Sequence, residues 1–415
     1  MKLFLKNVAK GTAQRFMVVA LSQIAIVLTL PHITRQLGIE IFSFVSIGMF
    51  ILQFSLVIID WGFYLNAVSY LNKHKNQLKQ SKFVSTLSVM RLIIISLICI
   101  ILYLAIYLVP KLHAHKSIFY ALLIPIIAGG MNPLWFFQIG NRPDILIIPT
   151  FFARLCYLAL IYYFIKMPAD AMWVFVAQGI TFSIVTIYGY SAMKRFGIKF
   201  VKPSLDLAKE MLKNSTHLFL SNLINNQANV IWGLGLSTFA SHQEIVFFNL
   251  ADQCYRAGIA ITGSLKDSIH MINLRTALLI EHIKPILFLI ILLFALTMLG
   301  WVASPKIIKY FFGVDFLPGL PVIYWMLGIW LLNSISNIVG YPFLGLLHNN
   351  LLVSRLNILV SILHILALAC WLFFDHNKTA AEVSEIIFFI SLIQCALFFK
   401  YIYSWIIKNR KGEPW

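Results

Sequence analysis

Long apolar segments follow one another along almost the whole chain and are separated by short polar stretches. A helix needs about 20 mostly apolar residues to cross the hydrocarbon core of a bilayer. The sequence contains twelve such segments, at residues 12–33, 39–69, 83–109, 117–139, 144–165, 169–192, 212–239, 243–272, 284–304, 319–347, 350–374 and 381–407. Since unpaired backbone groups are costly in lipid, we expect an all-α polytopic membrane protein with twelve transmembrane helices.

Composition excludes a soluble protein. Of the 415 residues, 60% are apolar and 12% are charged, whereas a soluble domain has roughly half its residues apolar and about a quarter charged. In a soluble chain the net charge of +18 would suggest a nucleic-acid partner. In a membrane protein it is explained by Lys and Arg in cytoplasmic loops, so we expect no nucleic-acid partner.

The basic residues also predict the orientation of the chain. With a cytoplasmic N-terminus, and with residues near the end of a span counted with the adjoining loop, 21 of the 33 Lys and Arg residues lie inside, 7 lie outside and 5 lie within the spans. This asymmetry predicts that both termini are cytoplasmic. Lys2, Lys6 and Lys10 precede the first apolar run as in a signal peptide, but no small-residue cleavage site follows, which indicates an uncleaved first span.

The longest polar segment, Lys194–Lys213, carries six basic residues. It predicts three parts: an N-terminal six-helix lobe at 1–193, a basic cytoplasmic linker at 194–213, and a C-terminal six-helix lobe at 214–415. A weak internal echo supports two equivalent halves, because Glu40-Ile41-x-x-Phe44 matches Glu244-Ile245-x-x-Phe248 at an offset of 204 residues. We therefore expect two lobes around a central cavity.

Several activities lack their signatures in the sequence. The chain contains no nucleotide-binding P-loop, no HExxH metal motif and no GxSxG nucleophile motif. The five cysteines lie scattered in apolar runs, so we expect no disulfide framework, no metal site and no cofactor beyond a coupling H⁺ or Na⁺. A secondary transporter and a membrane enzyme acting on lipid-linked substrates remain as the two classes.

Charged residues inside the predicted spans are candidates for function, because their burial in lipid is expensive. Arg91, Arg154 and Arg256 are candidate substrate-binding residues, since the guanidinium group suits phosphate and carboxylate. Asp60 and Asp252 are candidate ion-coupling residues. Structural explanations stay open, because Asp252 can neutralise Arg256 one turn later and Asp60 can anchor a helix end.

Two stripes of polar residues at helical spacing lie in the second half of the chain. They are predicted to face protein or water rather than lipid, and their candidate substrate-binding members are Asn222, Asn225, Asn229, Asn333, Asn337 and Tyr341. Amide groups bind sugar hydroxyls well, so we interpret the stripes as cavity lining. The alternative is hydrogen bonding between helices.

Three segments resemble motifs of a known family. Residues Pro31–Gly38, with Arg35 and Gly38, resemble a Pro-x-x-x-Arg-x-Leu-Gly outer loop. Asp60-Trp61-Gly62-Phe63 resembles an acidic-Tyr-Gly-Phe motif. Pro133-x-Trp135-Phe136-Phe137-Gln138 resembles a Pro-x-Trp-x-Phe-Gln motif that breaks the fourth span. Together they are similar to the Wzx-type O-antigen and polysaccharide flippases of the multidrug/oligosaccharidyl-lipid/polysaccharide exporter superfamily.

This chain departs from the family pattern at three places. Trp61 stands where the family has Tyr. In the second half of the chain, Ala251-Asp252-Gln253 is similar to the family's Ala-acidic-Lys, with Gln253 in place of Lys. Gln138-Ile139-Gly140-Asn141-Arg142 replaces the usual Gln-Gly-x-Glu-Lys turn.

The resemblance implies a flippase that moves undecaprenyl-pyrophosphate-linked repeat units of O-antigen or capsule to the periplasmic leaflet of the inner membrane by alternating access. It also implies partnership with a polysaccharide polymerase and a chain-length regulator. An ion-coupled drug antiporter of the same superfamily is an alternative, although cationic drugs would favour buried acids. A membrane enzyme of polysaccharide assembly is another, although such enzymes carry a large periplasmic loop.

Overall fold

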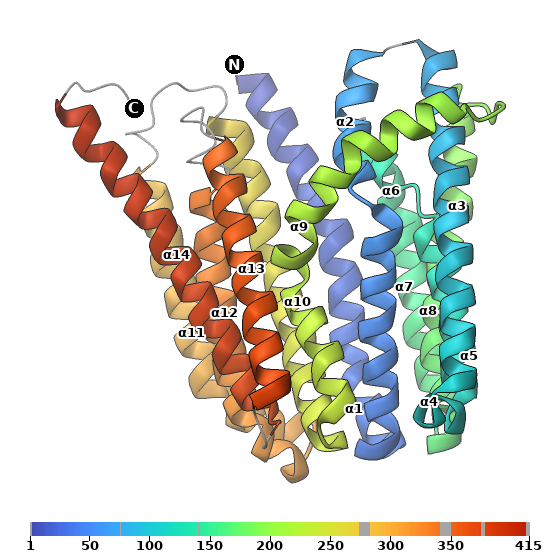
Figure 1. Ribbon diagram of the computed structural model, residues 1–415, viewed down its shortest axis with the longest axis vertical. Coiled ribbons are helices and arrows are strands. Elements are labelled where there is room, and N and C mark those ends of the chain that lie inside the picture. Colours follow the sequence, from blue (N-terminus) through green and yellow to red (C-terminus); the bar gives the residue numbers. More distant parts are fainter. Residues whose placement is uncertain are drawn as a thin grey trace. The chain divides into compact units, whose positions relative to one another are not determined.

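The computed structural model describes residues 2–74, 76–139, 142–273, 283–340, 350–374 and 378–411, and every regular element in these ranges is a helix (Figure 1). The longer helices are α1 (Lys2–Asp60), α2 (Phe63–Lys73), α3 (Gln77–Leu108), α5 (Lys116–Gly130), α7 (Ile147–Phe164), α8 (Trp173–Arg195), α9 (Leu205–Phe239), α10 (His242–Asn273), α11 (Ile283–Phe311), α12 (Leu320–Val339), α13 (Asn350–Phe374) and α14 (Ala380–Lys411). The short elements are α4 (Pro110–Ala114), α6 (Leu134–Ile139), and the 3₁₀ turns η1 (Pro143–Leu146), η2 (Pro168–Met172) and η4 (Val314–Gly319).

Nine helical segments in the described part of the chain are long and apolar enough to cross a membrane. The first of them, Ala25–Asp60, contains a break at Gly38, whose φ of 71° and ψ of 167° are not helical. This backbone conformation is accessible almost only to glycine, so α1 is two helices joined at one residue. With α9 and α10, of 35 and 32 residues, the arrangement is consistent with twelve crossings.

Two boundaries differ from the sequence-based expectation. The second span was predicted to run to residue 69, but α1 ends at Asp60 and α2 begins at Phe63. Trp61 and Gly62 both have positive φ, at 43° and 68°, which breaks the helix although the apolar pattern continues. The predicted linker 194–213 is also about half helical, because α8 extends to Arg195 and α9 begins at Leu205.

The chain divides into two compact units, Met17–Leu234 and Gly235–Trp415 with Met1–Phe16. We call them the N-terminal and C-terminal units. This division falls within α9, whereas the lobe boundaries at 193 and 214 remain a prediction.

The helices repeat along the sequence at the spacing of the internal echo. Helix α5 begins at 116 and α12 at 320, the helix after Gly38 begins at 39 and α10 at 242, and α8 begins at 173 and α14 at 380. The offsets of 204, 203 and 207 residues agree with the echo between Glu40 and Glu244. Packing repeats as well, since α5 lies against α8 in the N-terminal unit and α12 lies against α14 in the C-terminal unit.

At one end of the N-terminal unit, several helices pack together through a buried apolar cluster. Its fully buried aromatic members are Phe63, Phe83 and Phe137, from α2, α3 and α6. Ile198 and Met211 bring the segment after α8 and the first turns of α9 onto the same cluster. The motif Asp60–Phe63 is therefore held against the beginning of α9.

Candidate functional site

Arg91 connects two of the sequence motifs inside the N-terminal unit. Its Nη2 donates to Asp60 Oδ1 at 2.7 Å, and its Nη1 donates to the backbone oxygen of Asn132 at 3.3 Å. The guanidinium carbon lies 5.8 Å from the ring centroid of Trp135, within the range of a cation–π contact. The end of the second span and the broken fourth helix therefore meet at a residue of the third.

The two partners of this ion pair differ in exposure. The Arg91 side chain is 6% exposed and its Nε has no hydrogen-bond partner, whereas the Asp60 side chain is 43% exposed. The arginine is consequently held in place by the protein, and the carboxylate keeps access to solvent or to a small cation. The predicted substrate-binding role of Arg91 and ion-coupling role of Asp60 stay predictions.

The residues after Asp60 fix the motif to α9. Trp61 Nε1 donates to Thr216 Oγ1 at 3.0 Å, and its ring stacks on Phe219 with centroids 4.3 Å apart. Asn66 Nδ2 donates to Ser215 Oγ at 3.2 Å. The tight turn at Gly62 aims these side chains at α9, and Trp61 in place of the family's Tyr supplies both the stacking surface and the donor.

The broken fourth span has a defined cause. Pro133 cannot donate a backbone hydrogen bond, and Asn132 Oδ1 accepts from the backbone N–H of Leu134 at 3.0 Å, which starts α6. Trp135 is 7% exposed and belongs to the buried cluster. Gln138 is half-buried, and Gly140 and Asn141 lie outside the described residues. The predicted helix break is confirmed.

Arg154 on α7 is a buried cation without a carboxylate partner among the described side chains. It is 8% exposed, and its Nε and Nη1 are buried without any hydrogen-bond partner. The guanidinium carbon lies 5.9 Å from the ring centroid of Phe182 on α8. The neighbouring Ala153 carbonyl accepts from the hydroxyl of Thr181 at 3.5 Å, so α7 and α8 are in contact beside Arg154. An unpaired buried charge of this kind is a strong indicator of function.

The C-terminal unit contains a polar stripe on α10. Asn249, Asp252, Gln253 and Arg256 have the spacing of one helix face. The Nε of Arg256 donates to Asp252 Oδ2 at 2.7 Å, with side-chain exposures of 21% and 0%. The neutralising ion pair left open by the sequence is therefore formed, while the substrate and ion-coupling roles remain predictions.

Asn249 is the member of this stripe that the sequence interpretation missed. It is completely buried, and neither its Nδ2 nor its Oδ1 has a hydrogen-bond partner. Leaving such groups unpaired costs about 1–3 kcal/mol each. The spacing of three residues from Asp252 and seven from Arg256 was the available signal. Gln53 on α1 was missed in the same way, with a buried Oε1 that has no partner.

The structure describes only some members of the two predicted asparagine stripes. Asn333 Nδ2 donates to the hydroxyl of Tyr255 at 2.9 Å, which links α12 to α10. Asn337 is half-buried and Asn229 is buried. The side chains of Asn222 and Asn225, and the whole of Tyr341, lie outside the described part of the chain. Asn333 thus forms a hydrogen bond between helices, and its substrate-binding role stays a prediction.

The motif residues of the predicted first outer loop are located at the break in α1. Gly38 forms the break, and Arg35 is exposed one turn before it. The loop predicted between the first two spans is thus reduced to a single non-helical residue. Gly62 and Phe63 form the second break, with Phe63 fully buried in the cluster.

Comparisons with known proteins place the chain in a family. A family model described as "Polysaccharide biosynthesis protein" matches residues 8–265. A protein of Escherichia coli (strain K12) named "Putative O-antigen transporter" is 24% identical over 198 residues, which are 47% of this chain and 47% of that protein. The match thus spans about half the length of this relative.

Solved structures of MATE transporters share the fold. An inward-facing MATE family transporter of the MOP superfamily matches 99% of this chain and 96% of its own, with a TM-score of 0.66 and 12% identity. The outward-facing conformation matches 98% and 97%, with a TM-score of 0.57 and 13% identity. A mutant of the Vibrio cholerae MATE transporter VcmN matches 96% and 98%, with a TM-score of 0.54 and 14% identity.

Proposed function

Because the chain belongs to the polysaccharide biosynthesis protein family, we propose that it is a flippase for lipid-linked oligosaccharides and not an enzyme. The family match, which covers the motifs at Asp60 and Trp135, carries this proposal. The transporter fold supports it, and so does the meeting of both motifs at Arg91. The nine apolar segments support a multi-pass location, for which we propose the inner membrane.

We propose that the substrate is an undecaprenyl-pyrophosphate-linked repeat unit that is moved by alternating access. Its pyrophosphate and any acidic sugar carry negative charge that lipid cannot solvate. Arg154 supports this proposal because its guanidinium group is buried, charged and without a carboxylate partner among the described residues. A polymerase and a chain-length regulator would act on the delivered unit, and we propose them as functional partners.

Coupling to H⁺ or Na⁺ is proposed for Asp60 and Asp252. Asp60 is the better placed for exchange, since its side chain is 43% exposed while it contacts Arg91. Asp252 is fully buried beside Arg256. If transport and its dependence on the ion gradient were unchanged in both Asp60→Asn and Asp252→Asn, neither residue would have this role.

An ion-coupled drug antiporter is the second candidate, because the solved structures with this fold are MATE transporters. A cationic drug would need uncompensated buried acids. Among the described residues the buried uncompensated charge is instead Arg154, and the buried Asp252 is paired with Arg256. The charges therefore favour an anionic substrate.

The deciding experiment is translocation of a fluorescent undecaprenyl-pyrophosphate oligosaccharide in vesicles that contain the purified protein. We expect the labelled lipid to reach the opposite leaflet and to be chemically unchanged. Protection of the label from a membrane-impermeant quencher measures its arrival in that leaflet. Translocation of a cationic dye but not of this lipid would favour the antiporter. A covalently changed sugar, detected by chromatography, would identify an enzyme.

A further inference from the structure

The chain between α8 and the second turn of α9 is bound tightly to the N-terminal unit. Backbone N–H groups of Lys199, Val201 and Ser204 donate to side-chain oxygens on α3, at 3.1, 2.9 and 3.1 Å. The acceptors are Ser81, Ser85 and Thr86, respectively. Since a helix rises about 1.5 Å per residue, this segment runs alongside α3 for roughly 7 Å, from Ser81 to Thr86, before α9 begins.

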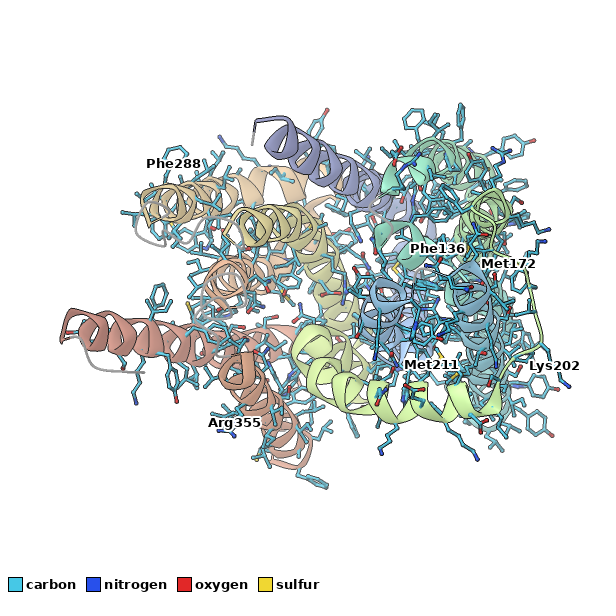
Figure 2. The ribbon with its side chains drawn as sticks, turned by 90° about the horizontal axis from the view of Figure 1, so that it is seen from above. Phe136, Met172, Lys202, Met211, Phe288 and Arg355 are labelled. Carbon is cyan, nitrogen blue, oxygen red and sulfur yellow. The ribbon has the colours of Figure 1, made fainter. Side chains whose placement is uncertain are left out.

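The beginning of α9 is amphipathic and lies across the other helices of its unit. Figure 1 shows α9 starting beside α3 and passing obliquely over α2. Leu207, Met211 and Ser215 form its buried face. In Figure 2, Met211 lies on the side of α9 toward the helices and Lys202 lies at the rim of the unit. The opposite face of this segment is therefore open to its surroundings.

That outer face combines large apolar side chains with basic ones. Phe200, Leu205 and Leu212 are 57%, 72% and 41% exposed. The exposed lysines are Lys199, Lys202, Lys209 and Lys213, and no ion pair involves them in the described part of the chain. Residues 194–213 hold six basic and two acidic residues, a net charge of +4. Exposed apolar groups among lysines are typical of segments at a membrane surface.

We propose that residues 196–213, which we call the interfacial segment, bind the anionic lipids of the surrounding bilayer. The apolar side chains Phe200, Leu205 and Leu212 enter the boundary between headgroups and acyl chains. The lysines contact lipid phosphate groups, to which polybasic segments near a membrane are attracted. Two observations select lipid as the occupant. The first is the positive charge. The second is that the segment contacts α8 at Tyr190 and α3 at Ser85, one turn from Ile187 and Val89, which are exposed apolar residues on helices long and apolar enough to cross a membrane.

The charge requirement is tested with the full-length protein in nanodiscs of phosphatidylcholine, with or without roughly a third of anionic phosphatidylglycerol. We expect phosphatidylglycerol to raise the unfolding temperature by several degrees. The combined variant Lys199→Gln, Lys202→Gln and Lys213→Gln should lose at least half of this rise. The matched control is Lys73→Gln, Lys79→Gln and Lys82→Gln, which removes three exposed charges at α2 and the start of α3 and should keep it.

Three outcomes would overturn the proposal: no effect of phosphatidylglycerol, equal losses in both triple variants, or loss of the effect on adding soluble inorganic pyrophosphate at matched ionic strength. The last would indicate a phosphate site rather than a membrane surface.

The depth of the interfacial segment in the bilayer is measured separately, in a cysteine-free protein labelled at Leu205→Cys or Glu210→Cys. Nitroxide on shallow lipid carbons should quench the first label, and aqueous iodide should quench the second. Equal quenching of both labels by iodide would contradict insertion.

Discussion

At the scale of single residues, the three arginines of the predicted spans differ in the partners that their guanidinium groups contact. Arg91 has a carboxylate, a backbone oxygen and an aromatic ring, and Arg256 has Asp252. Arg154 has the ring of Phe182, and two of its nitrogens are buried without a partner. Arginine keeps its proton in proteins, so the local structure leaves the charge of Arg154 available for a ligand.

Arg154→Ala should therefore abolish translocation without lowering the amount of inserted protein, because Arg154 forms no ion pair among the described residues. Arg154→Lys should restore part of the activity, since the charge remains and the planar fork is lost. The matched control is Arg355→Ala, which removes an exposed arginine at the start of α13. The measurement is surface polysaccharide per molecule of inserted protein. Unchanged output per molecule in Arg154→Ala would refute a ligand role.

Arg91→Ala should behave in the opposite way and lower the stability of the N-terminal unit. Removing one partner of a buried ion pair costs about 3–5 kcal/mol, and we expect roughly 1–3 kcal/mol because Asp60 is 43% exposed. The measurement is the unfolding temperature in detergent. Asp60→Asn leaves Arg91 buried without its carboxylate, so it should be destabilising too. Native unfolding temperatures in both variants would mean that the pair is not structural.

At the scale of helices, the sequence predicted the spans better than their breaks. Apolar periodicity does not distinguish a helix that continues from one that stops at Trp61 and Gly62, because both sides of the break are apolar. The Asp252–Arg256 pair could be proposed from its spacing within one helix. The Asp60–Arg91 pair joins residues 31 positions apart on different helices, and no local pattern indicates such a contact.

The kink in α1 gives a test at this scale. Gly38→Ala should destabilise the protein by about 1–3 kcal/mol, because its φ of 71° and ψ of 167° are strained for any side chain. A Cβ there would meet no atom within 4 Å, so the cost is one of backbone conformation alone. Gly263→Ala in α10 is the control, since a Cβ there also meets no atom within 4 Å and the φ is not positive. Equal unfolding temperatures for both variants would contradict a helix break at Gly38.

At the scale of the whole molecule, one five-residue match between Glu40–Phe44 and Glu244–Phe248 predicted an internal repeat. The structure adds helices that begin at offsets of 203 to 207 residues in the two halves. The two halves differ in their polar groups. At an offset of 204, Asp252 and Arg256 of α10 correspond to Gly48 and Leu52 of α1. The charged stripe is thus specific to the C-terminal half, while the unpaired Arg154 belongs to the N-terminal half. The spacing within one helix could indicate the Asp252–Arg256 pair, but no local pattern indicates that Arg154 is buried without a carboxylate partner, because that depends on tertiary contacts.

Topology provides the test at this scale, and it is independent of any substrate. Helix α3 separates the two ends of the N-terminal unit: Lys199 is bonded to Ser81 near its beginning, and Lys111 lies in α4 just after its end. The 28 residues from Ser81 to Leu108 span about 40 Å, enough to cross a bilayer. In a cysteine-free protein, an impermeant maleimide applied to intact cells should label Lys111→Cys and not Lys199→Cys, and permeabilised cells should allow both. Labelling of Lys199→Cys but not Lys111→Cys in intact cells would reverse the orientation that the basic residues predict, and labelling of both would contradict the crossing itself.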